Sequence, residues 1–179
     1  PTLTSGRFDF VLFDSPAPLL TNQARGTTEH LVRIESAIRY YRSRTGLPVW
    51  LMGHSKGGYS LSEFVRHAQK TDKMQLVAGL IASGIVNDAS FDAPLTLPML
   101  FIHHKNDACQ FTSAATSFRN YEKVRAFNPE PVEFVYVTGG GPEPRNPCRS
   151  GYHMYFGAGD EVARYLDDFM TRHSQLPQR

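Results

Sequence analysis

Cysteine is scarce in this chain, and its scarcity argues against one class of site. The 179 residues contain two cysteines, Cys109 and Cys148, with no C-x-x-C motif. No Cys/His spacing of the kind that binds zinc is present either. We therefore expect no structural metal, and we predict no cofactor.

Long apolar runs and an excess of one charge are also missing. No apolar stretch approaches the ~20 residues that cross a bilayer, so a membrane span is not expected. The 19 Lys and Arg residues nearly balance the 17 Asp and Glu residues, without a basic run, which argues against a nucleic-acid partner. The N-terminus carries neither a signal-peptide pattern nor an initiator methionine, and we expect a processed or truncated chain.

The residues that are present suit one globular domain over residues 1–179. Hydrophobic residues make up 41% of the chain and charged residues 20%, which is typical of folded domains. Five apolar runs predict strands covered on both faces, because they are apolar nearly throughout rather than alternating. The runs cover residues 8–14, 48–53, 75–82, 97–104 and 132–139.

Segments whose apolar residues have helical spacing lie between most of these runs. This spacing predicts helices that open near Thr27, directly after Ser55, near residue 114 and near Asp160. Strands that alternate with helices predict a three-layer α/β domain with a mainly parallel sheet. Residues 138–151 are rich in Gly and Pro and predict a long loop, a feature that is uncommon in compact domains unless it is functional or disordered.

The stretch Gly53-His54-Ser55-Lys56-Gly57 is a G-x-S-x-G pattern between a predicted strand and a predicted helix. Glycines two places before and after the serine are expected to remove Cβ clashes at a sharp turn. In this context the pattern is typical of a nucleophile elbow, which strains the serine backbone and projects the hydroxyl above the sheet. The pattern alone also occurs in ordinary turns, so the flanking strand and helix carry the prediction.

A nucleophilic serine requires a histidine base, and the base requires a carboxylate to hold its tautomer. In the chain order serine, acid, histidine, Asp107 directly follows the run 97–104 and is the predicted acid. Asp88 and Asp92 follow an earlier strand, where a turn or cap is the favoured role. His153 lies before the last predicted helix and is the predicted base, because the other six histidines do not have this position.

The motifs GHSKGG, LPMLFIHHKNDAC and GYHMYFG together resemble the α/β-hydrolase superfamily over about residues 8–173. More narrowly, they resemble bacterial esterase-like hydrolases that carry one Cys after the acid and another before the base. The resemblance implies hydrolysis of an ester or related acyl bond through an acyl-enzyme. It implies Ser55 as nucleophile, His153 as general base and acid, and Asp107 as the residue that orients His153. It also implies that the backbone N–H of Lys56 donates to the oxyanion.

The chain departs from this family at the second oxyanion donor. That donor normally comes from a Gly-rich loop after an earlier strand, and no H-G or H-G-G-G loop precedes Ser55. Only one predicted strand, over 8–14, precedes the elbow strand. We therefore expect an α/β-hydrolase fold without its N-terminal strands, whose missing segment has been cut away, is disordered, or belongs to another chain. Otherwise the backbone near Ser15 to Ala17 must supply the donor.

Three functions stay open on the sequence. The leading one is a serine hydrolase for a small ester, lactone or thioester. A serine peptidase is a second, although no acidic or basic specificity feature supports it. The third is a non-catalytic α/β-hydrolase-like binding module, which the missing loop makes more credible. His54, Trp50 and Tyr152 are candidate walls of a substrate pocket, although such residues more often belong to the core.

The two cysteines flank the predicted acid and base. Cys109 lies two residues after Asp107, and Cys148 lies five residues before His153. If acid and base converge, their loops converge too, and the Cα atoms of the cysteines can come within the roughly 4.4 to 6.8 Å that a disulfide needs. We predict the disulfide, because the Gly- and Pro-rich loop over 138–151 has few other means of fixing the base. A disulfide would imply the periplasm or the medium, whereas the alternative of two buried free thiols would fit a cytoplasmic enzyme.

Overall fold

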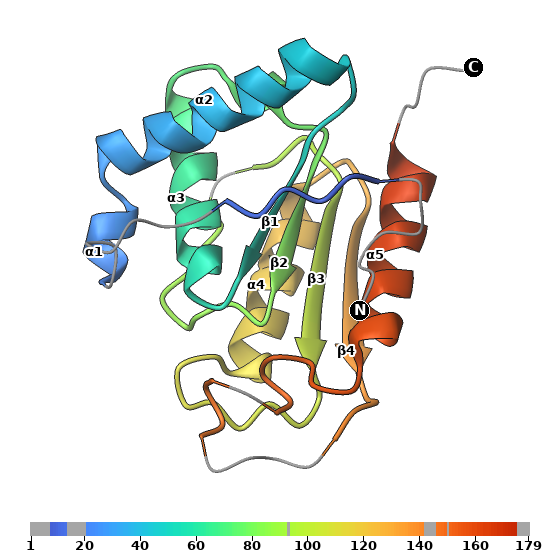
Figure 1. The fold of residues 1–179 in the computed structure, drawn as a ribbon. Coiled ribbons are helices and arrows are strands. Elements are labelled where there is room, and N and C mark those ends of the chain that lie inside the picture. The colour runs from blue at the N-terminus through green and yellow to red at the C-terminus, as the bar shows by residue number, and fades with distance from the viewer. Residues whose placement is uncertain (1–7, 14–20, 93, 142–145, 150, 175–179) are drawn as a thin grey trace.

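A parallel four-stranded sheet organises the part of the chain that the structure describes. The structure is a computed structural model, and it describes residues 8–13, 21–92, 94–141, 146–149 and 151–174. Its strands are β1 (Trp50–His54), β2 (Gly79–Ser83), β3 (Met99–His104) and β4 (Val132–Val137), paired in parallel in that order (Figure 1). Its helices are α1 (Asn22–Arg25), α2 (Thr28–Thr45), α3 (Lys56–Lys70), α4 (Ala114–Phe127) and α5 (Gly159–His173), with a 3-10 turn η1 at Met74–Leu76.

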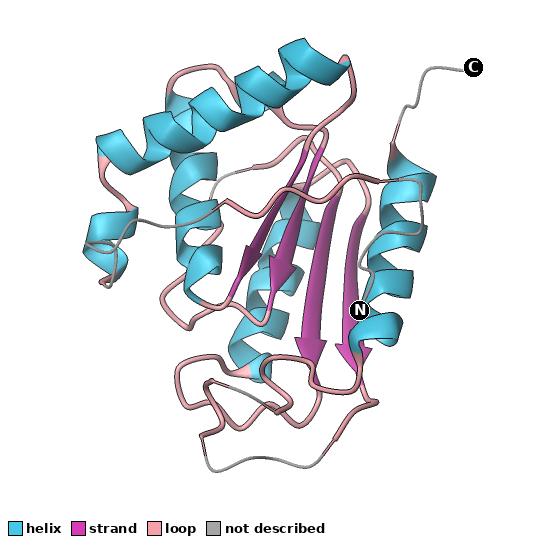
Figure 2. Ribbon diagram, viewed as in Figure 1, coloured by secondary structure: helices cyan, strands magenta, loops and turns pink. Residues whose placement is uncertain are grey.

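Helices cover both faces of the sheet, as Figure 2 shows. Leu80 and Ala82 of β2 face a core built with α2, α3 and α4, whereas Ile81 between them faces α5. Every residue of β2 and β3 is buried. This double burial is the reason why these runs are apolar throughout, and it confirms the predicted mixed α/β class with a parallel sheet.

Helix α2 begins and ends where local chemistry favours it. The hydroxyl oxygen of Thr27 accepts the backbone N–H of His30 and caps α2, which confirms the predicted start. Gly46 ends that helix in the left-handed conformation at φ 68°, where glycine carries no Cβ penalty. No described helix combines the length and the apolar character needed to cross a membrane.

The strand predicted over 8–14 is wrong for residues 8–13, which form neither strand nor helix. Phe10, Val11 and Leu12 are 51%, 47% and 83% exposed. An apolar run becomes a buried strand only where a neighbouring strand completes its hydrogen bonds and other layers cover its faces. Among the described strands none pairs with this segment, so neither condition is met.

The parallel arrangement places the carboxyl ends of all four strands at one edge of the sheet, where the arrowheads lie in Figure 1. Sites in open α/β sheets commonly form at this edge, because the loops that leave the strands converge there. His54, Ser83 and His104 end β1, β2 and β3. The described residues of the long segment, 138–141 and 146–149, contain neither helix nor strand, as predicted.

Candidate active site

Ser55 is the single residue between the end of β1 and the start of α3. Its backbone has φ 53° and ψ −122°, a conformation that costs free energy for any residue with a side chain. The backbone N–H of Ser55 donates to the carbonyl of Ser83 at 3.0 Å, which ties the turn to the end of β2. The turn therefore has the geometry that the sequence pattern predicts.

The glycines around this turn differ from the expectation in one respect. A Cβ at Gly53 would overlap the backbone carbonyl of Gly57, so only glycine fits there. A Cβ at Gly57 itself would meet nothing within 4 Å. The second close approach involves Gly58 instead, where a Cβ would overlap the side chain of Ile85. The prediction that Gly57 relieves a clash is wrong, because a Cβ at this position would lie in open space.

Three side chains that are far apart in sequence form one hydrogen-bonded chain. Nε2 of His153 lies 2.9 Å from Oγ of Ser55, and Nδ1 of His153 lies 2.9 Å from Oδ2 of Asp107. The side chains of His153 and Asp107 are each 1% exposed. Since an ionised carboxylate only accepts hydrogen bonds, Nδ1 of His153 carries the proton and Nε2 offers a lone pair to the serine hydroxyl.

Asp107 receives four hydrogen bonds. Its Oδ1 accepts the backbone N–H of Cys109 at 2.9 Å. Its Oδ2 faces His153, the Thr112 hydroxyl at 3.0 Å and Nε2 of His103 at 3.1 Å. Burial acts to raise the pKa of Asp107, but hydrogen bonds from His103, His153 and Cys109 outweigh it and hold the pKa well below its usual range. The carboxyl group is therefore ionised throughout the neutral range.

A second imidazole lies against the first. The ring of His54 has its centroid 5.0 Å from that of His153, and its Nδ1 lies 3.1 Å from Oγ of Ser83. Burial, followed by the nearby His153, lowers the pKa of His54 to about 4. His54 is therefore uncharged at neutral pH and places no positive charge beside His153.

The turn that carries His153 is anchored two residues later. The hydroxyl of Tyr155 donates to the carbonyl of Ile102 at 3.0 Å and lies 3.0 Å from Oγ of Ser83. Burial raises the pKa of Tyr155, so it remains a phenol that can donate. These contacts join the His153 turn to the carboxyl ends of β2 and β3.

A hollow of about 130 Å³ opens beside the serine turn. It borders the residue that follows Ser55, and the N–H of Val86 donates to the Ser55 carbonyl at 3.3 Å. Phe111 contributes an apolar side chain that is 60% exposed. The residues that line the hollow are Asn22, Lys56, Val86, Asn87, Asp88 and Phe111. Its volume suits a substituent of a few heavy atoms.

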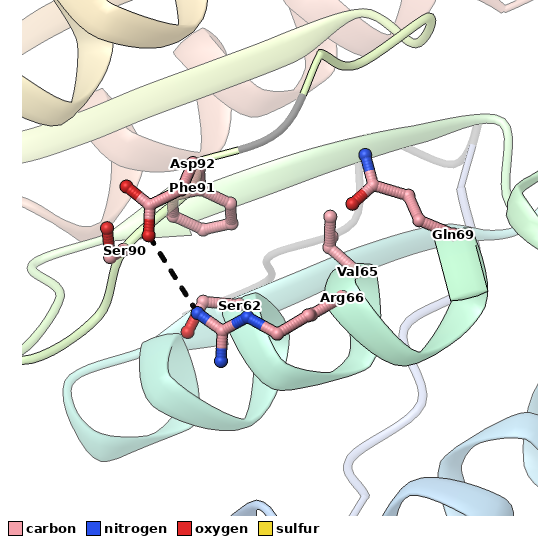
Figure 3. Close-up of a pocket in the computed structure, with 7 residues that line it drawn as sticks. All are labelled: Ser62, Val65, Arg66, Gln69, Ser90, Phe91 and Asp92. Atoms are coloured by element: carbon pink, nitrogen blue, oxygen red, sulfur yellow. Dashed lines mark ion pairs between the residues drawn. The ribbon is translucent and has the colours of Figure 1, made fainter.

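A smaller hollow of about 50 Å³ lies further along α3, and Figure 3 shows its lining. The guanidinium of Arg66 approaches the Asp92 carboxylate to 3.9 Å there. Its lining residues are Ser62, Val65, Arg66, Gln69, Ser90, Phe91 and Asp92, and none is a candidate site residue. We assign it no role.

The other predicted site residues have the following positions. Trp50 lies at the amino end of β1, where its ring packs edge-on against Phe169 and its Nε1 donates to Ser174 at 2.9 Å. Tyr152 stacks on His104 with ring centroids 4.4 Å apart. Neither lines the hollow beside Ser55, so their part in a pocket stays a prediction. Lys56 begins α3 and lines that hollow. The role of its backbone N–H as an oxyanion donor also stays a prediction.

The two cysteines meet as predicted. Their sulfur atoms lie at the distance of a disulfide, and the Cα atoms of Cys109 and Cys148 are 4.6 Å apart. Because the N–H of Cys109 also donates to Asp107, the pair connects the loop that holds the acid to the segment that precedes His153. Ser15 to Ala17, the proposed second source of an oxyanion donor, lies outside the described residues.

Sequence reasoning missed four residues of this network. His103 and Thr112 bind Asp107, while Ser83 and Tyr155 connect His54 to the end of the sheet. His103 left only a partial signal, because adjacent strand residues point to opposite faces and which of the two terminal histidines faces the acid depends on packing. Thr112 left none, since its contact depends on the path of the loop.

Comparison of the chain with models of known protein families and with curated proteins found no match. In the described ranges no group of three or more His, Cys, Asp or Glu side chains is placed to hold a metal ion. The geometry of Ser55, His153 and Asp107 is therefore the evidence that bears on function.

Proposed function

We propose that this protein is a serine hydrolase of the α/β-hydrolase kind, which cleaves a small ester, lactone or thioester through an acyl-enzyme. The observation that carries the proposal is the chain of two 2.9 Å contacts from Ser55 through His153 to Asp107. It lies at the carboxyl edge of a parallel sheet, on a strained strand-to-helix turn. The hollow of about 130 Å³ beside this turn supports a small substrate.

The proposed reaction uses each member of the chain at a stated atom. Oγ of Ser55 attacks the substrate carbonyl carbon while Nε2 of His153 takes the hydroxyl proton. The ionised Asp107 stabilises the imidazolium that forms. When the tetrahedral intermediate collapses, the leaving group takes that proton from Nε2. A water molecule that gives a proton to His153 then attacks the acyl-serine carbonyl, and when this second intermediate collapses Nε2 returns the proton to Oγ of Ser55 as the acid product leaves.

The oxyanion of the intermediate requires N–H donors. We assign one to the backbone of Lys56, because it is the first residue of α3 and the amino end of a helix carries partial positive charge. With this donor alone, we expect a rate lower by on the order of 10² to 10³ than with two. The Cys109–Cys148 pair supports export to an oxidising compartment, the periplasm or the medium.

The strain at Ser55 favours catalysis over the binding-module alternative. A non-Gly residue at φ 53° and ψ −122° costs of order 1 to 3 kcal/mol, and such strain is concentrated at functional sites. A ligand-binding surface has no need of a serine hydroxyl aligned on an imidazole. The peptidase alternative gains no support from the structure.

A fluorophosphonate probe tests the proposal. We expect it to add covalently to Ser55, as found by mass spectrometry of the tryptic peptide, and Ser55→Ala to remove both labelling and hydrolysis of p-nitrophenyl acetate. The substitution removes one hydroxyl and little packing, so the circular dichroism spectrum should not change. A folded protein that neither reacts with the probe nor hydrolyses a panel of short esters would favour the binding module.

A further inference from the structure

His103 is a buried imidazole that the proposed reaction does not use. It is the next-to-last residue of β3, and the structure leaves it 0% exposed. Its Nε2 lies 3.1 Å from Oδ2 of Asp107 and 3.2 Å from the backbone carbonyl of Thr112. Burying a polar ring at this depth costs free energy that its hydrogen bonds have to offset.

The partners of His103 fix the position of its proton. Both atoms near Nε2, a carboxylate oxygen of Asp107 and the carbonyl oxygen of Thr112, can only accept. Nε2 must therefore be protonated. Nδ1 of His103 is buried and has no hydrogen-bond partner among the described residues. The ring thus makes its hydrogen bonds through Nε2, which faces Asp107.

We propose that His103 is a positioning residue that holds the Asp107 carboxylate for His153. One N–H joins the acid to the carbonyl of Thr112, whose hydroxyl donates to the same Oδ2 at 3.0 Å. The oxygen that binds His153 is thereby fixed from the strand side. The inference rests on the proposed function, since it assigns His103 to the reaction of Ser55.

Loss of this N–H has a consequence that packing alone does not have. With one donor fewer, the Asp107 carboxylate becomes more basic and stabilises the imidazolium of His153 more strongly. The acid limb of the pH–rate profile therefore moves to higher pH. Two other titratable side chains face this pair, His54 on β1 and Tyr155, and both are uncharged at neutral pH because burial lowers the pKa of His54 and raises that of Tyr155. Because His103 contacts the acid and no residue of the hollow, we expect kcat to fall and KM to stay near its wild-type value.

The first test needs no substitution. Long-range ¹H–¹⁵N spectra of the ¹⁵N-labelled wild-type protein report which ring nitrogen of each histidine is protonated, with His103→Gln used to assign the signals. We expect Nε2 of His103 to carry the proton at neutral pH. A His103 ring protonated on Nδ1 alone overturns the proposal, because it would have no donor to offer Asp107. This readout does not depend on activity, so it stands even if the proposed hydrolysis fails.

The second test compares two substitutions of nearly equal shape. His103→Met removes the donor, whereas His103→Gln can place an amide N–H where Nε2 lies. For H103M we expect kcat to fall by about 10- to 100-fold, the size of one hydrogen bond to a charged group, with the acid limb moved to higher pH. We expect H103Q to recover most of that rate and the wild-type profile. Equal losses in the two folded variants, with the acid limb unmoved, would show that His103 only fills space. A wild-type protein without activity would instead count against the proposed function.

Discussion

Asp107 shows how a single residue determines what the candidate site can do. Both of its carboxylate oxygens accept hydrogen bonds, Oδ1 from the Cys109 N–H and Oδ2 from the side chains of His103, Thr112 and His153. An amide can supply an acceptor on one side only. Whichever way an asparagine is turned, one of its N–H groups faces another donor.

Asp107→Asn should therefore remove most of the activity while keeping the volume of the side chain. We expect kcat/KM for p-nitrophenyl acetate to fall by on the order of 10⁴, because the histidine is no longer held in the tautomer that leaves Nε2 free for the serine. Asp92→Asn is the matched control, since Asp92 pairs with Lys123 and Arg66 away from the site. Similar rates in the two variants would remove Asp107 from the reaction.

His54 should make stability depend on pH. Its pKa of about 4 in the folded protein is below the roughly 6.5 of a free histidine, so the unfolded chain binds more protons between these values. The free energy of unfolding should therefore fall as pH falls from about 6.5 to 4, by up to about 1.4 kcal/mol per pH unit from this residue. His54→Asn is expected to flatten this part of the curve, because an amide can replace Nδ1 opposite Ser83 but does not titrate. Urea unfolding at several pH values measures it, and parallel curves for both proteins would contradict the assignment.

At the scale of elements, the serine turn depends on a close approach between β1 and α3. On β1 the close contact is at Gly53, where a Cβ would overlap the carbonyl of Gly57. On α3, by contrast, a Cβ at Gly57 would meet nothing within 4 Å. Both glycines look alike in the G-x-S-x-G pattern, so the difference between them was not available from the sequence.

This difference predicts opposite outcomes for two alanine substitutions. Gly53→Ala should lower the free energy of unfolding by about 1 to 3 kcal/mol, because backbone atoms must shift to admit the methyl group. Gly57→Ala lies in the first turn of α3, where alanine is favoured over glycine by roughly 0.5 to 1 kcal/mol. Chemical denaturation of the two variants beside wild type measures both. Equal destabilisation would mean that the turn differs from the one described.

The strands show which apolar runs in the sequence were sufficient to predict a strand. The runs at 97–104 and 132–139 became β3 and β4 with small shifts of their ends. The run at 8–14 is also mostly apolar, but its described residues are largely exposed and form no strand. Composition predicts that a segment can be a strand, whereas pairing depends on a neighbour, which a local pattern does not contain.

At the scale of the whole molecule, the order of motifs along the chain predicted which residues would meet. Ser55 follows β1, Asp107 follows β3 and His153 precedes α5, and parallel strands bring these loops to one edge. Chain order could not predict His103 as a partner of the acid. Its role depends on which face of β3 the side chain occupies, and that is decided by packing.

The cysteine pair gives a prediction for the molecule as a whole, because it closes a loop that contains α4 and β4. Cys109 and Cys148 are 39 positions apart, and closing a loop of that length should contribute about 4 kcal/mol in the chain-entropy model. We expect intact mass after alkylation without reductant to show no modified thiol, and reduction to lower the midpoint of thermal unfolding. Activity should fall as well, since the pair connects the Asp107 loop to the segment before His153. The control is a Cys109→Ser, Cys148→Ser double variant. It should match the reduced protein in thermal midpoint and in activity, and it should no longer respond to reductant. Two alkylated thiols in the folded, unreduced protein would refute the crosslink and with it the argument for an oxidising compartment.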